Sequence, residues 1–276
     1  MSVAIIKKRT SAAKRAPANA SNGSRDLLMV NSVAKAFRVL RVFDCSRPSL
    51  SLSEIAEIAG LDVSATQRFT HTLLKLGYLE KDAASRRFGL TVKVLELGQS
   101  YASANPLVKQ AIPYLLHLNK DTEETINLTV LDETSIVFIV RFLSRHVFNT
   151  DVVIGTRLPA YCTAPGRAIL SRLPSDEAEA IVSSSDLRPL TAHTPRTVAD
   201  VMGRVARAAA KGYALQVEEC FYGDMSVSAA VIDGRGRPVG AINIGVATTR
   251  YTPQEMEVRF APMVVAAARS VSDISL

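Results

Sequence analysis

Hydrophobic residues recur every three or four positions in three short segments between residues 32 and 77. In the first segment Val33, Phe37, Leu40 and Phe43 form one apolar stripe, and Ser32 stands where an N-cap would accept from the first free amides. This spacing predicts a first helix that buries the stripe against the rest of a small domain.

The second segment begins with the sequence SLSE, in which Ser51 and Glu54 have the spacing of a capping box. Three apolar residues of the following turns face one side, namely Ile55, Ala56 and Ala59. Gly60 follows them and can adopt the positive φ that ends a helix. A short second helix and a tight turn are therefore expected.

The third segment has Asp62 as its expected N-cap and Gly77 as its stop. Its apolar stripe consists of Phe69, Leu73 and Leu76, and a polar row follows the opposite side: Ser64, Gln67, Arg68, His71 and Lys75. Two short strands around a polar turn come next, in YLEKDAASRRFGL. Helix, short helix, glycine turn, helix and hairpin, in this order, predict a winged helix-turn-helix over residues 26–90.

The remaining chain contains segments with the helical period and segments with the two-residue alternation of strands. Residues 91–105 predict a linker helix, and residues 106–276 predict a second domain. Strands are expected at 125–131, 135–142, around 147–153, 226–232 and 238–246, and helices at 163–173, 176–183 and 198–210, with a last helix from about 253 that Pro262 kinks. The fold class is therefore α+β, with a mostly antiparallel sheet and helices packed on it.

Charged residues are distributed unevenly over the same regions. The net charge is +7, but residues 1–25 hold six basic residues and no acidic one. Residues 26–90 hold nine basic and seven acidic residues, and residues 91–276 hold 18 basic and 19 acidic residues. This layout predicts a disordered basic arm at 1–25 and a small module that faces a polyanion, beside a near-neutral body.

The polar row of the third helix is the main candidate for chemistry. Gln67 and Arg68 are placed for bidentate contacts to adenine and guanine edges, and Ser64, Thr66 and His71 for phosphates or bases. Lys75, Arg86 and Arg87 suit contacts to the DNA backbone. The alternatives are a solvated helix face or a winged helix that binds protein.

Other motifs carry weaker signals. The sequence DGRGRPVG precedes a strand-like alternation, so it predicts a hairpin turn and not a phosphate loop. Cys162 could be a nucleophile, but no positioned base accompanies it, and a packed thiol is the favoured interpretation. The three separated cysteines, the four scattered histidines and the lack of a long apolar run favour a cytoplasmic protein without metal, cofactor or membrane span.

Two further patterns concern binding. Between 239 and 246, one face carries Ile242, Ile244 and Val246, and the other carries small and polar residues that face solvent or form the floor of a pocket. Arg141 alternates with Val137 and Ile139 and is a candidate carboxylate anchor.

Several longer motifs occur together: SVAKAFRVL, LSEIAEIAGL, SATQR and LLKLGYL near the N-terminus, then GTRLPAYCTAPGRAIL, KGYALQVEE and VIDGRGRPVGAINI. With them the chain, from about Asp26 onward, resembles the IclR family of bacterial transcriptional regulators. The segments RLPAYCT and LRPLTAHTPRTV are more similar to the subgroup that governs breakdown of aromatic acids.

The resemblance implies a winged-helix domain, a linker helix and a GAF-like effector-binding domain, assembled as a homodimer or tetramer on operator DNA. It also implies a small organic acid bound beneath the loop at 158–165. The matching pocket positions are Leu158, Ala164, Pro165, Gln216, Asp224, Ser226, Asn243 and Gly245. Departures from the family pattern at Ala65, Thr66 and Pro165 put the DNA target and the ligand in question, and Gly245 favours a ligand larger than pyruvate.

Overall fold

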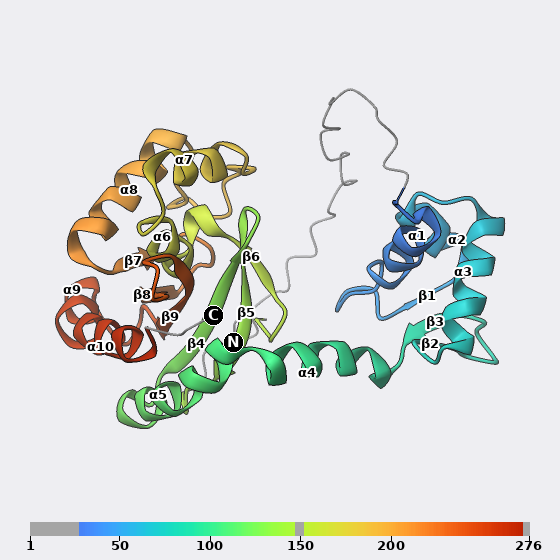
Figure 1. The fold of residues 1–276 in the computed structure, drawn as a ribbon, viewed down its shortest axis with the longest axis horizontal. Coiled ribbons are helices and arrows are strands. Elements are labelled where there is room, and N and C mark those ends of the chain that lie inside the picture. Colours follow the sequence, from blue (N-terminus) through green and yellow to red (C-terminus); the bar gives the residue numbers. More distant parts are fainter. Residues whose placement is uncertain (1–27, 147–151, 273–276) are drawn as a thin grey trace, which may run out of the picture. The chain divides into compact units, whose positions relative to one another are not determined.

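The computed structural model describes residues 28–146 and 152–272, and the chain divides into two units, Met1–Val94 and Leu95–Leu276 (Figure 1). The arm expected at residues 1–25 lies outside the described residues, as does most of the strand expected around 147–153.

The first unit is a winged helix-turn-helix, as predicted. Its helices are α1 (Asn31–Leu40), α2 (Leu52–Ala59) and α3 (Val63–Lys75). Its strands are β1 (Ser49–Leu50), β2 (Leu79–Lys81) and β3 (Phe88–Leu90), which pair antiparallel in the order β1-β3-β2. Side chains from all three helices and all three strands form one core: Val39, Val42, Phe43, Leu50, Ile55, Ala59, Leu73, Leu79 and Phe88.

Helix α1 differs from its prediction. Its N-cap is Val30 and not Ser32, and no side chain caps the helix. Val33 and Phe37 are about half exposed, at 52% and 53%, whereas Val39 is fully buried. The prediction of a buried stripe was therefore wrong for Val33 and Phe37, because none of the elements described in this unit covers the N-terminal half of the helix.

The turn between α2 and α3 follows the sequence closely. Ser51 and Glu54 form the complete capping box, Gly60 has φ 62°, and the carboxylate of Asp62 accepts from the amide of Ala65 at 2.7 Å. Leu76 was expected in the buried stripe but is 53% exposed, because α3 ends one residue earlier and Leu76 is its C-cap.

The second unit is built on a six-stranded antiparallel sheet, in the order β6-β5-β4-β9-β8-β7. Its strands are β4 (Thr125–Asp132), β5 (Ser135–Phe142), β6 (Arg157–Pro159), β7 (Ala214–Val217), β8 (Asp224–Ile232) and β9 (Pro238–Ala247). The predicted α+β class is confirmed. The sequence did not predict the edge strands β6 and β7, which are three and four residues long and too short to show an alternation.

The helices of this unit are α4 (Leu95–Ala104), α5 (Pro106–Thr122), α6 (Ala164–Leu170), α7 (Ser175–Ser183), α8 (Val198–Lys211), α9 (Pro253–Glu255) and α10 (Ala261–Val271). Short turns η1 (Val92–Val94) and η2 (Ala160–Cys162) precede α4 and α6. The irregularity expected near Pro262 is a π-helical turn, η3 (Met256–Phe260), directly before α10.

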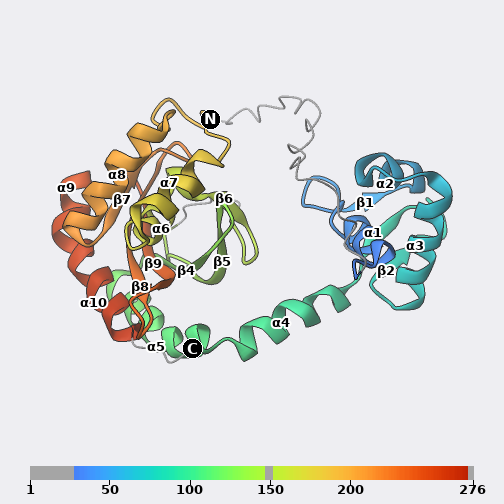
Figure 2. The same ribbon diagram turned by 45° about the horizontal axis from the view of Figure 1, so that its top comes forward.

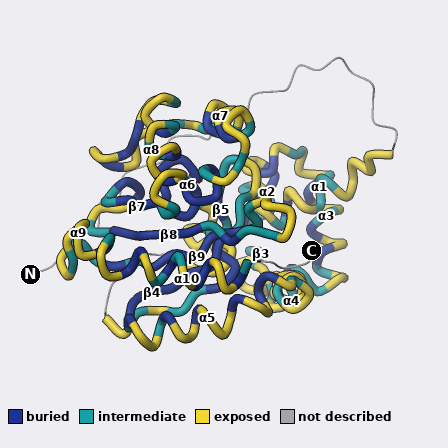
Figure 3. The backbone as a smooth tube through the Cα atoms, turned by 60° about the vertical axis from the view of Figure 1, so that its left-hand side comes forward, coloured by how far each residue is buried: buried dark blue, intermediate teal, exposed yellow. Residues whose placement is uncertain are grey.

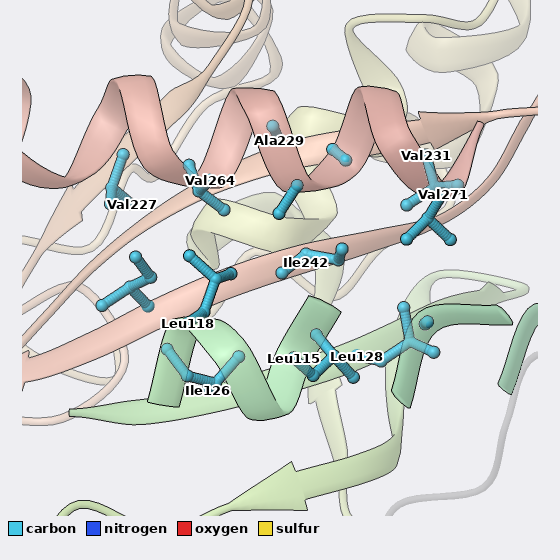
Figure 4. Close-up of a cluster of buried hydrophobic side chains, with 14 of the residues drawn as sticks. Leu115, Leu118, Ile126, Leu128, Val227, Ala229, Val231, Ile242, Val264 and Val271 are labelled. Atoms are coloured by element: carbon cyan, nitrogen blue, oxygen red, sulfur yellow. The ribbon is translucent and has the colours of Figure 1, made fainter. Parts of the chain in front are cut away.

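Helices cover both faces of the six-stranded sheet (Figures 1 and 2). Helices α5 and α10 pack on one face, where Leu115 and Leu118 meet Val264 and Ile242 in the main core (Figure 4). Helix α6 packs on the opposite face, with α8 against it and α7 against α8. The strands between these layers are mostly buried, while the outer helical surfaces are exposed (Figure 3).

Helix α6 lies unusually close to the turn η2 that leads into it. A Cβ atom on Gly166 would stand 2.2 Å from the backbone oxygen of Ala160, closer than any real contact. Because backbone on both sides sets this distance, no side-chain rotation relieves it. Only glycine fits at this position.

We expect Gly166→Ala to lower the free energy of unfolding by about 1–3 kcal/mol or more, since the helix must move away from η2. The matched control is Gly203→Ala in α8, where an added Cβ meets nothing nearer than Arg207 Nη1 at 3.9 Å. That change should raise stability by roughly 0.5–1 kcal/mol through helix propensity. Urea denaturation measures both, and equal effects would contradict the packing argument.

Candidate functional site

The outer face of α3 is exposed and polar. Ser64, Gln67, Arg68, His71 and Lys75 all lie on it, while Thr70 and Leu73 point into the unit. Within residues 28–146 and 152–272, no carboxylate pairs with Arg68 or Lys75. The predicted row is therefore presented to solvent with its donors available.

The prediction for Thr66 was wrong. It was expected to reach phosphates or bases, but it is fully buried and its Oγ1 donates to the backbone oxygen of Asp62 at 2.9 Å. Thr70 makes the same bond one turn later, to Thr66, so both hydroxyls are used inside the helix.

The wing separates the two arginines that were predicted together. Arg86 is exposed at the turn with φ 61°. Arg87 points back into the unit, where its Nη2 donates to Ser49 O at 2.9 Å and to Glu54 Oε2 at 2.8 Å. Because this guanidinium joins the wing to β1 and to the first turn of α2, we assign it a bracing role, whereas Arg86 remains exposed.

In the second unit, the sheet face under α6 carries two rows of mostly polar and mostly buried residues that run across the strands. One row follows the register Arg141, Asn127, Asn243, Ser228 through β5, β4, β9 and β8. The next row follows Thr125, Gly245, Ser226, Gln216 through β4, β9, β8 and β7. Polar groups rarely line a buried sheet face without a partner to satisfy them, so these rows mark a site.

A cavity opens over these rows, with about 520 Å³ of space including its mouth. All nine residues chosen from the sequence line it: Leu158, Ala164, Pro165, Gln216, Asp224, Ser226, Asn243, Gly245 and Arg141. The polar face of the 239–246 segment thus forms a cavity wall. The sequence did not identify other lining residues, among them Thr125, Asn127, Phe138, Cys220 and Phe221. The alternation of residues along β4 could have indicated Thr125 and Asn127.

A β-bulge determines where Arg141 points. Phe138 pairs with Thr129 and Val140 pairs with Leu128, so Ile139 is left over between them. Simple alternation placed Arg141 on the face of Val137, which was wrong. The extra residue switches the side on which later residues point, so Arg141 joins Phe138 at the cavity.

Arg141 and Asp224 are the charged residues that line the cavity. Arg141 Nη1 donates to Asn127 Oδ1 at 2.9 Å, and Gln216 Nε2 donates to Asp224 Oδ2 at 2.5 Å. Burial lowers the pKa of Arg141. Burial raises the pKa of Asp224 to about 6, against smaller opposing effects of the Gln216 hydrogen bond and of Arg141.

Asn243 supplies an acceptor that the described chain does not use. Its side chain is 4% exposed, and its Oδ1 has no hydrogen-bond partner among the described residues. A buried acceptor without a donor costs about 1–3 kcal/mol. A hydroxyl or amine group in the cavity would satisfy it.

A buried ion pair holds the upper wall of the cavity, which consists of Thr163, Ala164, Pro165, Cys220 and Phe221. Arg167 in α6 is 1% exposed and donates to both carboxylate oxygens of Glu219, at 2.6 and 3.0 Å, and to Leu215 O at 2.8 Å. Arg204 in α8 reaches the same carboxylate at 2.8 Å. Thr194 donates to Glu219 O and Thr191 to Glu218 O, so the segment before Cys220 is fixed on several sides.

Cys162 is the packed thiol that the sequence favoured. It is fully buried in η2, and its sulfur lies near Pro159 O and Cys220 Sγ. Among the described residues, no three metal-ligating side chains cluster together.

Both units of the chain match known protein families. Residues 32–83 match the IclR helix-turn-helix domain, and residues 99–273 match the family described as bacterial transcriptional regulator IclR C-terminal. The chain belongs to the IclR family. It is a transcriptional regulator of this family with a helix-turn-helix DNA-binding domain.

Curated relatives and a solved structure match most of the length of this chain. The chain is 30% identical to the Pca regulon regulatory protein of Pseudomonas putida, over 88% of this chain and 83% of that protein. It is 30% identical to the p-hydroxybenzoate hydroxylase transcriptional activator of Acinetobacter baylyi, over 82% and 84%. A crystal structure of a transcriptional regulator from Rhodococcus sp. RHA1 superposes with a TM-score of 0.78 at 32% identity, over 88% and 97%.

In the described part of this IclR-family chain, no helix is long and apolar enough to cross a membrane.

The raised pKa of Asp224 should make the free energy of unfolding depend on pH. Its ordinary value is 3.8 and its folded value is about 6, so the folded state holds the proton more tightly than the unfolded chain. Ionisation therefore costs stability as the pH rises from 4 to 7, and nothing below pH 4. Asp224→Asn removes this cost while Asn still accepts from Gln216.

We expect the unfolding free energy of Asp224→Asn, relative to the unaltered chain, to increase between pH 4 and pH 7 by at least about 1 kcal/mol. Urea denaturation of both proteins at pH 4, 5.5 and 7 gives this difference. The contributions of the other carboxylates cancel, because both proteins contain them. A difference that stays constant across this range would show that Asp224 titrates normally.

Proposed function

We propose that this IclR-family regulator binds a specific operator through α3 and the wing, and that a small aromatic acid in the cavity of the second unit controls its DNA binding or activity. As such it would act in the cytoplasm. The observation that carries the ligand proposal is the pair of mostly polar and mostly buried rows on the sheet face, with a charged group and an unsatisfied acceptor among them.

For DNA, the supporting features are the exposed row of α3 and the exposed arginine of the wing. Gln67 and Arg68 lie on the outer face of a capped helix, and such side chains make bidentate contacts to base edges. Arg86 and Lys75 supply charge for phosphates, which position the protein without specifying sequence. A homodimer or a dimer of dimers would place two such helices on a pseudo-palindromic operator.

For the ligand, charge, shape and hydrogen bonding agree. Arg141 provides a positive group beside an apolar wall made by Ile136, Phe138 and Leu158. In this proposal an aromatic ring lies between that wall and the polar floor, and its carboxylate pairs with Arg141. Gly245 leaves space above the floor, since a Cβ there would meet its nearest neighbours only at 3.9 Å.

The ligand controls DNA binding if it binds two arrangements of the linker helices unequally, since only differential affinity shifts an equilibrium. Carboxylate binding next to Asp224 also favours the protonated form of that side chain. Ligand binding and proton uptake are therefore coupled in this proposal.

Replacing Arg68 by Ala should weaken binding to a fragment upstream of the protein's own gene by about 1–3 kcal/mol and relax the preference at one base pair. Arg235→Ala is the control, because it removes the same charge from an exposed turn of the other unit. Competition binding with single-base variants of the fragment measures both effects.

Equal losses in the two variants would assign the Arg68 effect to net charge alone and remove its role in base readout. Binding that is insensitive to salt would instead favour a winged helix that contacts protein, since phosphate contacts release counterions.

Asn243→Ala should weaken binding of 4-hydroxybenzoate about tenfold, which corresponds to about 1.4 kcal/mol. Benzoate lacks the hydroxyl that would donate to Asn243 Oδ1, so its affinity should change little. Calorimetry gives both affinities, and binding to the upstream DNA fragment without ligand should be unaffected. Equal losses for the two acids would contradict the assignment of Asn243 to the ligand hydroxyl.

A further inference from the structure

The two buried cysteines of the second unit lie next to each other although 58 residues separate them in sequence. Cys162 Sγ and Cys220 Sγ are 3.1 Å apart. Cys162 is fully buried and Cys220 is 7% exposed, and both are reduced. A disulfide has an S–S length of about 2.05 Å, so the sulfurs need to approach by only about 1 Å to bond.

The neighbouring ion pair fixes this approach. Arg167 follows Cys162 by five residues and Glu219 directly precedes Cys220, so the buried ion pair and the two thiols connect the same two segments. The hydroxyl of Thr194 also holds Glu219 O at 2.7 Å. The sulfurs are therefore held together by contacts that do not involve sulfur.

The cavity gives access to the pair. Cys220 lines it, beside Thr163, Ala164, Pro165 and Phe221, whereas Cys162 lies behind Cys220. A small oxidant that enters the cavity meets Cys220 first, and Cys162 is in place to react next. The third cysteine, Cys45, is exposed in the first unit and serves as an internal reference.

We propose that Cys162 and Cys220 are an oxidisable dithiol. Its disulfide draws Cys220, which lines the cavity, toward Cys162, and this displacement of a lining residue lowers the affinity of the cavity for the effector. The disulfide itself is independent of any ligand, while its effect on affinity rests on the proposed function. A hydroperoxide is the oxidant.

The chemistry proceeds in two balanced steps. The Cys220 sulfur attacks the terminal oxygen of the hydroperoxide, the O–O bond breaks, and a sulfenic acid and an alcohol are formed. The Cys162 sulfur then attacks the Cys220 sulfur, the S–O bond breaks, and water leaves with the last thiol proton. The two thiols lose two electrons in total, which reduce one peroxide.

The reaction is expected to be slow. The hydrogen bond with Cys162, together with burial, raises the pKa of Cys220, and the thiolate is the reactive form. The pair is therefore suited to sustained oxidative conditions. A ligand in the cavity should slow the reaction further by blocking the route to Cys220.

The first test is peptide mapping of the full chain without reduction, after treatment with cumene hydroperoxide or hydrogen peroxide. The expected product is one linked pair of peptides containing Cys162 and Cys220, with the loss of two hydrogen atoms and reversal by dithiothreitol. Cys45→Ser should give the same product, and Cys162→Ala should not. Oxidation confined to Cys45, or a disulfide that includes Cys45, would overturn the proposal.

The second test compares the oxidised and reduced protein by calorimetry with 4-hydroxybenzoate. We expect at least a tenfold weaker affinity after oxidation, restored by dithiothreitol and absent in Cys162→Ala. Equal affinities in the two states would overturn the regulatory role of the disulfide. If the reduced protein does not bind the probe while the linked peptides still form, the choice of ligand fails and the dithiol stands.

Discussion

Arg167 places a positive charge inside the second unit, where 1% of its surface is exposed, and Glu219 neutralises it with two hydrogen bonds. An unpaired charge at this depth would cost several kcal/mol, so α6 and the segment before Cys220 cannot separate while the unit is folded. This pair also fixes the residues that form the upper wall of the cavity.

The sheet beneath is divided into a face that stabilises and a face that binds. Ile242 and Ile244 point into the main core with α5 and α10, whereas Asn243 and Gly245 point to the cavity. The binding face carries a cost, since buried polar groups lose hydration and Asn243 Oδ1 has no partner in the described chain. Folds keep such groups mainly where function requires them, and the apolar face supplies the stability that this requires.

In the first unit, α3 is fixed in position while one of its faces remains exposed. The capping box at Ser51, the positive φ of Gly60 and the Asp62 cap set where α3 starts. Arg87 ties the wing to Glu54 and β1, so α3 and the wing are held by contacts on their inner sides. The polar side chains that face outward take no part in the core and are available for DNA.

Local sequence alone determined the features that depend on neighbours along the chain: the caps of α2 and α3, the glycine turns and the alternation from Gly240 to Val246. The motif resemblance selected eight residues and the strand alternation a ninth, Arg141, and all nine line one cavity. Only the tertiary structure decided that Thr66 points inward, that Val33 and Phe37 lie uncovered, and that a bulge at Ile139 turns Arg141 toward the cavity. Periodicity reports which side chains share a face, but a register shift between strands and the presence of a covering element depend on distant residues. For the same reason two cysteines that the sequence keeps 58 residues apart lie in contact.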